Sequence, residues 1–397
     1  MNSVKNIYGE KLIAWLYISL VATSILGDML YWLVSKSFAG YAKLFFYPAL
    51  LIILIELLIN KKIIKDEFLI FLSLTAGICL IIGLHNNQIG KAFFAHFLPF
   101  VLPIFAYSYG FRSELVSGRL SITINKYAIK AGYILVGLVA IYYPLVQAGH
   151  IEYFGAGALF AYPLFYAVKE KLYYSAAIFY VANVFTGKRS VFLAISIVLL
   201  IYLYKKSNAL VKLILFGSIA TLAAFLYVEG SGTEGHLLGP QLDRYLVIFQ
   251  YLAENDDVFK AIDLATSGRL YDVLAVIDRL GDNLFNWLFG IGFGAVIAID
   301  YSFSEETLIT HYSHVTPFSY LLLGGFLLLI VVYTKLLHET WYAFKNIHNH
   351  LSMMLIYFVI IGFSGAIFFT DVFVWIIIGV FTAMRIKEQK NLQQFKL

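Results

Sequence analysis

The fold is decided by apolar runs such as residues 67–84, EFLIFLSLTAGICLIIGL, in which the single charged residue, Glu67, stands at the edge. A helix of about 20 residues crosses the hydrocarbon core of a bilayer. Only helices and closed barrels can satisfy all of their backbone hydrogen bonds in lipid. The run therefore predicts a transmembrane helix.

The composition extends this prediction to the whole chain. Of 397 residues, 61% are hydrophobic and 13% are charged, whereas roughly a quarter are charged in an ordinary soluble domain. The mean hydropathy is +0.80. These values exclude a soluble enzyme and a disordered protein. The single cysteine, Cys79, lies in an apolar run, which excludes an intrachain disulfide and is typical of a buried side chain.

Similar runs recur along the chain and predict an all-α, polytopic integral membrane protein with about twelve transmembrane helices. No small-residue cleavage site follows the first run, which we interpret as a retained signal anchor. The predicted spans are 12–34, 41–60, 67–84, 91–109, 127–148, 156–168, 172–186, 190–204, 209–228, 316–337, 352–367 and 369–384.

The distribution of lysine and arginine predicts that both ends of the chain face the cytoplasm. In this orientation 20 of the 29 basic residues fall on the inner side and nine on the outer side, as the positive-inside rule requires. The spans contain few ionisable residues, and Asp28 and Glu56 lie near predicted helix ends. A proton-coupled transporter normally needs such residues near the bilayer midplane, so this pattern disfavours a transporter.

One predicted outer loop, residues 229–315, is far longer than most of the others, and loops of this length usually carry function. The chain therefore divides into residues 1–228, 229–315 and 316–397. The stretch Asn283–Ile299 is expected to dip into the membrane or to lie on it. Apolar spacing also predicts an amphipathic helix, capped by Thr266-Ser267, whose apolar face comprises Leu270, Val273, Leu274, Ile277 and Leu280.

Outer cations are the candidate binding residues. The long loop holds thirteen carboxylates against four basic residues, so each arginine there needs a reason. Arg279 stands between two aspartates and is interpreted as a local ion pair, and Arg244 stays ambiguous. Arg269 has Asp272 three residues on, which a surface pair would also explain. Lys188 and Arg189 lie in a tight outer turn with no carboxylate nearby in sequence, which favours a function over simple head-group contact.

Two histidines, His311 and His314, precede the tenth predicted helix. No other Cys or His completes a metal site at suitable spacing, so no metal is predicted. We expect one of the two histidines to act as a general base or as a hydrogen-bond partner of a substrate, the alternative being an exposed interfacial side chain.

Five short motifs follow one another along the chain, namely Gly-Lys-Arg-Ser at 187–190, Ser-Gly-Arg-Leu at 267–270, Phe-Gly-Ile-Gly-Phe-Gly at 289–294, His314, and Leu-Gly-Gly at 323–325. In this order they resemble the Wzy-type O-antigen/capsule polymerases and their relatives, the O-antigen ligases. In the family an Asn often follows the histidine, whereas Val315 follows His314, so His311 stays an alternative counterpart.

The resemblance implies a GT-C-like membrane glycosyltransferase in the bacterial inner membrane, with its active site facing the periplasm. Its substrates would be oligosaccharide repeat units linked to undecaprenyl diphosphate, with no cofactor and no nucleic acid. The implied catalytic residues are Arg189, Arg269 and His314, because bidentate guanidinium groups suit a diphosphate leaving group without a metal. The implied substrate-binding residues are Lys188, Arg244, Tyr271 and His311.

The polymerase interpretation has two alternatives. An O-antigen ligase would use the same donor and transfer the glycan to lipid A core, and short motifs do not separate the two enzymes. A lipid-linked oligosaccharide flippase or another transporter would not need an 87-residue helical loop on one side of the membrane. The resemblance also makes membrane lipid and a polysaccharide chain-length regulator candidate partners.

Overall fold

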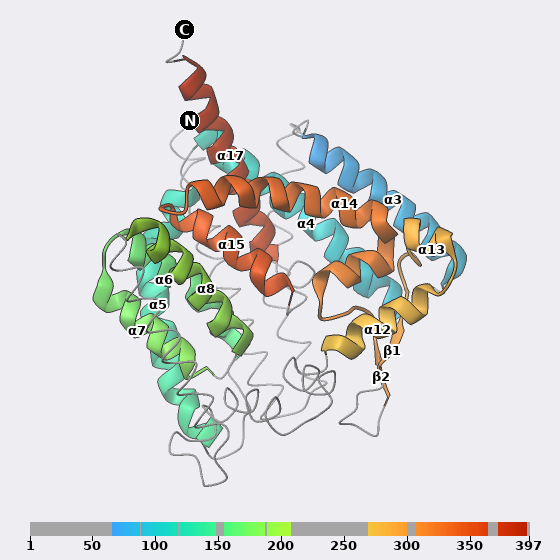
Figure 1. The fold of residues 1–397 in the computed structure, drawn as a ribbon, viewed down its shortest axis with the longest axis horizontal. Coiled ribbons are helices and arrows are strands. Elements are labelled where there is room, and N and C mark those ends of the chain that lie inside the picture. The colour runs from blue at the N-terminus through green and yellow to red at the C-terminus, as the bar shows by residue number, and fades with distance from the viewer. Residues whose placement is uncertain are drawn as a thin grey trace, which may run out of the picture.

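The computed structural model describes residues 66–87, 89–117, 120–147, 155–186, 189–207, 269–299, 307–363 and 372–394. These residues are mostly helical (Figure 1). The predicted spans 12–34, 41–60 and 209–228 lie outside the described residues. Elsewhere the helices are α3 (Glu67–Asn86), α4 (Lys91–Ser117), α5 (Leu120–Gln147), η3 (Gly155–Phe160), α6 (Ala161–Lys169), α7 (Tyr173–Val184), α8 (Arg189–Lys206), α12 (Arg269–Leu280), α13 (Leu284–Phe289), α14 (Thr316–Lys345), α15 (His350–Gly362) and α17 (Val372–Gln394).

Three of the described helices are long and apolar enough to cross a membrane, namely Glu67–Asn86, Ser121–Leu145 within α5, and Thr316–Lys345. Two shorter apolar helices, Ala158–Lys169 and His350–Gly362, accompany them. The described residues therefore form a mostly helical structure with three candidate membrane-spanning helices.

Local sequence signals set several of the helix ends. The side chain of Asp66 accepts a hydrogen bond from the amide of Phe68 at 2.9 Å and caps α3, and Asn349 caps α15 in the same way through Leu351. Helix α14 begins with Thr316 and a proline, whose missing N–H costs nothing in a first turn.

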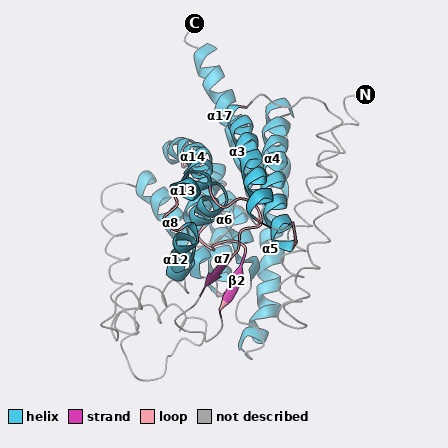
Figure 2. Cartoon of the chain, turned by 90° about the vertical axis from the view of Figure 1, so that its right-hand side faces the viewer, coloured by secondary structure: helices cyan, strands magenta, loops and turns pink. Residues whose placement is uncertain are grey.

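Glycines allow the closest helix contact, which joins α4 to α17. A Cβ at Gly110 would lie 2.2 Å from the carbonyl oxygen of Ile376, and one at Gly379 would lie 2.3 Å from that of Tyr107. Small residues permit such backbone approach between helices in membranes. Figure 2 shows α3 and α4 side by side, with the C-terminal part of α17 extending beyond them.

A buried ion cluster also ties α14 to α17. Arg385 forms two hydrogen bonds to the fully buried Glu339, of 2.8 and 2.9 Å, and Lys335 lies 3.0 Å from the same carboxylate. Nearby, Lys387 donates to the carbonyl of Glu114 in α4. The C-terminal parts of α4, α14 and α17 thus lie at one end of the described bundle.

The structure adds a feature that the sequence analysis did not predict. Strands β1 (Ile297–Ile299) and β2 (Leu308–Thr310) form a two-stranded antiparallel sheet in which Ala298 pairs with Ile309. The sheet leads the chain from the glycine-rich segment after α13 to the start of α14.

Candidate functional site

The centre of the candidate site is Asp272, a carboxylate with no exposed surface in the first turn of α12. Its Oδ2 accepts a hydrogen bond of 2.8 Å from the backbone amide of His314 and lies 2.8 Å from Nδ1 of the same histidine. A carboxylate is an acceptor, so Nδ1 carries the proton in this contact. The other ring nitrogen, Nε2, then has its lone pair available in the neutral ring.

This arrangement is the one by which a buried carboxylate orients a histidine base in many hydrolases. It fixes the tautomer and the ring, and it stabilises the imidazolium that forms when Nε2 accepts a proton. The side chain of His314 is 35% exposed, so a ligand can reach it. We call these two residues the Asp272–His314 pair.

A guanidinium group stands beside the pair. Nη1 of Arg269 lies 3.7 Å from Oδ2 of Asp272, and its side chain is 27% exposed. At this distance the two groups form an ion pair but not a well-formed hydrogen bond. The aspartate therefore does not occupy the N–H donors of Arg269. Burial raises the pKa of Tyr312 while the Arg269 cation opposes that rise, and the Tyr312 and His314 rings are 6.0 Å apart.

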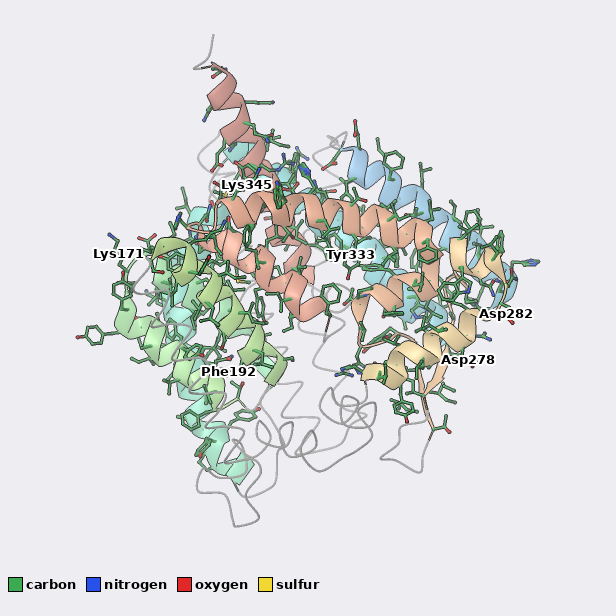
Figure 3. All side chains as sticks on the ribbon, in the orientation of Figure 1. Lys171, Phe192, Asp278, Asp282, Tyr333 and Lys345 are labelled. Atoms are coloured by element: carbon green, nitrogen blue, oxygen red, sulfur yellow. The ribbon has the colours of Figure 1, made fainter. Side chains whose placement is uncertain are left out.

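Helix α12 places Arg269 and Asp272 together because residues three apart share one face. The buried residues of the helix are Asp272, Val276 and Leu280. Of the predicted apolar face, Leu280 is buried, whereas Leu274 and Ile277 are 49% and 38% exposed. Figure 3 shows α12 running outward, with Asp278 near its far end and Asp282 just beyond.

The glycine-rich segment after α13 packs into the interior of the helix bundle. Its amides donate to helix carbonyls, Ile291 to Leu322 at 2.8 Å and Phe293 to Cys79 at 3.1 Å. Cys79 lies roughly 10 Å along α3 from the end of that helix. The segment therefore packs between α3 and α14.

A break in helix α14 and a close glycine–glycine contact make this packing possible. Helix α14 is broken at Gly325, whose φ of 60° and ψ of −160° are non-helical, and the break leaves the carbonyls of Leu322 and Leu323 to the incoming segment. A Cβ at Gly292 would lie 2.2 Å from the amide nitrogen of Gly83. Irregular backbone is tolerated at membrane depth only where protein satisfies it, as it does here.

His96 of α4 connects this segment to the histidine region. The amide of Gly294 donates to Nδ1 of the fully buried His96 at 3.0 Å, so Nε2 carries the proton and donates to the carbonyl of His311. The rings of His96 and His311 meet edge to face, 6.1 Å apart. His96 thus holds both ends of the segment that carries the small sheet.

The residues predicted from sequence fall into two groups. Arg269, Tyr271, His311 and His314 are described, and the structure brings Arg269 and His314 together through Asp272. Tyr271 is half-buried and packs against the core. Arg189 begins α8, and its side chain lies outside the described residues, as do Lys188, Arg244 and the predicted cap Thr266-Ser267.

Sequence reasoning missed Asp272 and His96. The sequence analysis names Asp272 only in a surface pair that would also explain Arg269, and its complete burial indicates a different role. An aspartate on the otherwise apolar side of a short helix was the available signal.

Within the described part of the chain, no three His, Cys, Asp or Glu side chains are grouped as metal ligands. Comparisons of the chain with known protein families, curated proteins and solved structures return no match.

Proposed function

We propose that this chain is a polysaccharide polymerase, of the O-antigen or capsule type, that transfers a glycan between undecaprenyl diphosphate carriers. The observation that carries the proposal is the Asp272–His314 pair with Arg269 beside it, an oriented base next to a cation. A base and a phosphate-binding cation are the two groups that this reaction needs.

The reaction proceeds by one displacement. An acceptor hydroxyl oxygen attacks the anomeric carbon of the donor glycan and forms the new glycosidic bond. The bond between that carbon and the diphosphate oxygen breaks, and undecaprenyl diphosphate leaves with the bonding electrons. Nε2 of His314 takes the hydroxyl proton, and Asp272 stabilises the resulting imidazolium. A single displacement inverts the anomeric configuration.

In this mechanism arginine side chains bind the diphosphate leaving group. Negative charge grows on the diphosphate as the bond breaks, and a planar guanidinium group can bind two of its oxygens at once. Arg269 fills this role from α12, and we propose that Arg189, at the start of α8, contributes a second guanidinium group. Stabilisation by preorganised cations of this kind needs no metal ion.

The proposed topology is the one that the lysine and arginine distribution predicts. About twelve helices span the bacterial inner membrane, both ends of the chain are cytoplasmic, and the Asp272–His314 pair faces the periplasm. The joint location of the C-terminal parts of α4, α14 and α17 supports this arrangement, because all three belong to segments predicted to be inside.

Reconstitution tests the proposed activity. Purified protein in liposomes, supplied with an undecaprenyl-diphosphate-linked repeat unit, is expected to release undecaprenyl diphosphate and to lengthen the glycan. Arg269→Ala should abolish both, whereas Arg279→Ala, an exposed arginine on the same helix, should keep parental rates. Equal activity of the two variants would remove Arg269 from the mechanism. Transfer only to lipid A core would identify a ligase instead.

A further inference from the structure

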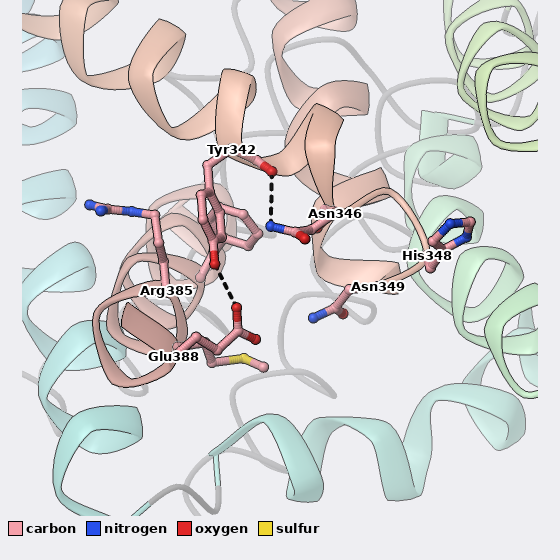
Figure 4. Close-up of a pocket in the computed structure, with 9 residues that line it drawn as sticks. Tyr342, Asn346, His348, Asn349, Arg385 and Glu388 are labelled. Carbon is pink, nitrogen blue, oxygen red and sulfur yellow. Dashed lines mark hydrogen bonds between the residues drawn. The ribbon is translucent and has the colours of Figure 1, made fainter. Parts of the chain in front are cut away.

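A second site lies at the other end of α14 from the Asp272–His314 pair. A cavity of about 210 Å³ opens where the C-terminal turn of α14, the start of α15 and the end of α17 meet (Figure 4). A cavity of this size holds several water-sized groups, which suits a small polar ligand group. Its polar lining includes Asn346, Asn349, Ser352, Arg385 and Glu388.

The floor of the cavity contains an unsatisfied donor. Ser352 has no exposed surface, and its Oγ has no hydrogen-bond partner among the residues that the structure describes. Leaving a buried hydroxyl unpaired is unfavourable, because nothing replaces its lost hydrogen bonds to water. A group that enters the cavity and accepts from Ser352 recovers this free energy.

The backbone around Ser352 favours an anionic acceptor. Ser352 is the third residue of α15, a helix of 13 residues capped by Asn349. The first-turn amides of a helix have no intrahelical acceptors, and the helix dipole places partial positive charge there. Phosphate groups bind at such helix ends, and the Ser352 hydroxyl adds a side-chain donor.

The charges across the cavity favour a ligand that also carries a cation. Glu388 accepts a hydrogen bond of 2.6 Å from Tyr342 through Oε2, and this carboxylate would repel a simple anion. Arg385 offsets it only in part, because its guanidinium group is paired with the buried Glu339, a carboxylate that Lys335 also contacts. A zwitterion with a phosphoryl group and an ammonium group matches both sides of the cavity.

The surroundings indicate that this zwitterion comes from lipid. Trp341 and Phe344, in the same last turns of α14, are 66% and 40% exposed, and Lys345 lies over the Trp341 ring. Exposed aromatic residues beside lysine are typical of the level of lipid head groups. A phospholipid can therefore place its head group in the cavity and keep its acyl chains outside.

We propose that this cavity binds the phosphoethanolamine head group of a membrane phospholipid. Phosphoryl oxygens accept from Ser352 Oγ and from the first-turn amides of α15 that the Asn349 cap leaves unbonded, and the ammonium group pairs with Glu388. The proposal does not depend on the glycosyl-transfer function, and its test does not use that activity.

Native mass spectrometry of the purified full-length protein tests this proposal, with phosphatidylethanolamine and phosphatidylglycerol of identical acyl chains as probes. The parent protein is expected to retain phosphatidylethanolamine about tenfold better. Ser352→Ala should lower that retention about tenfold, because a hydrogen bond to a charged group is lost. Ser196→Ala, a matched change on α8 that does not line the cavity, should not lower it.

Two variants that remove a carboxylate charge test the proposed contact with the ammonium group. Glu388→Gln should remove the preference for phosphatidylethanolamine, and Glu170→Gln, an exposed carboxylate outside the cavity, should keep it. Equal retention of both lipids by the parent protein, or equal retention in the two serine variants, would overturn the proposal. Soluble phosphoethanolamine that binds as tightly as the lipid would reassign the site to a soluble ester.

Discussion

The burial of Asp272 is the most informative property of any single residue in this chain. A carboxylate without exposed surface is retained only where partners compensate its lost hydration. Here the partners are two donors of His314 and the nearby guanidinium group of Arg269. In the proposed mechanism Asp272 therefore positions His314 and does not itself contact the substrate.

Asp272→Asn tests this positioning role. The amide has the same shape but no charge, so it no longer stabilises an imidazolium or selects the tautomer with its proton on Nδ1. We expect kcat for chain extension to fall by about 10²-fold or more with KM nearly unchanged. Steady-state kinetics in proteoliposomes measure kcat and KM separately.

Asp278→Asn is the matched control, because Asp278 is an exposed aspartate on the same helix. Its kcat should equal that of the parent protein. If Asp272→Asn raised KM and left kcat intact, the carboxylate would be a substrate-binding group and not a positioning one. Asp272→Glu should recover part of the rate if the charge is what matters.

At the scale of elements, the break in α14 and the glycine-rich segment form one unit. Gly83→Ala tests this contact, since the added Cβ would lie 2.4 Å from the carbonyl oxygen of Phe293. Overpacking of this kind costs about 1–3 kcal/mol. We expect a lower unfolding temperature in detergent and loss of chain extension, because the segment leads to the small sheet and to His314.

Gly77→Ala provides the control on the same helix, because nothing lies within 4 Å of a Cβ added there. Alanine is favoured over glycine inside a helix by roughly 0.5–1 kcal/mol, so the unfolding temperature should stay constant or rise. Similar behaviour of the two variants would contradict the close packing of α3 against the glycine-rich segment.

Sequence patterns predicted the apolar helices well and their ends less well. The run 67–84 became α3 with almost the same limits, since apolar length alone defines such a helix. Helix α4 extends past the predicted end at residue 109 to Ser117, because Arg112 and Glu114 continue the helix beyond the apolar run. Hydropathy does not register polar helical turns of this kind.

The candidate site was only partly predictable for a different reason. Arg269 and His314 stood out as charged or titratable residues in the long outer loop, but their meeting depends on Asp272, which lies 42 residues before His314. The contact of His96 with Gly294, which are 198 residues apart, is also long-range. Local periodicity carries no information on such contacts.

At the scale of the whole molecule, the two sites should face opposite sides of the membrane. A thiol introduced by Asp282→Cys, in the loop after α12, should react with a membrane-impermeant maleimide in intact spheroplasts. One introduced by Gln389→Cys, near the end of α17, should react only after permeabilisation. The native Cys79 is buried, so the parent protein should stay unlabelled. Labelling of both variants in intact spheroplasts would contradict the proposed topology.

The central claim is that His314, held by Asp272, removes the acceptor proton during glycosyl transfer. The most direct measurement is the release of undecaprenyl diphosphate by His314→Gln in proteoliposomes supplied with carrier-linked repeat units. We predict that this variant still binds the carrier-linked substrate but releases no undecaprenyl diphosphate above the background rate. Release at the parental rate would contradict the claim.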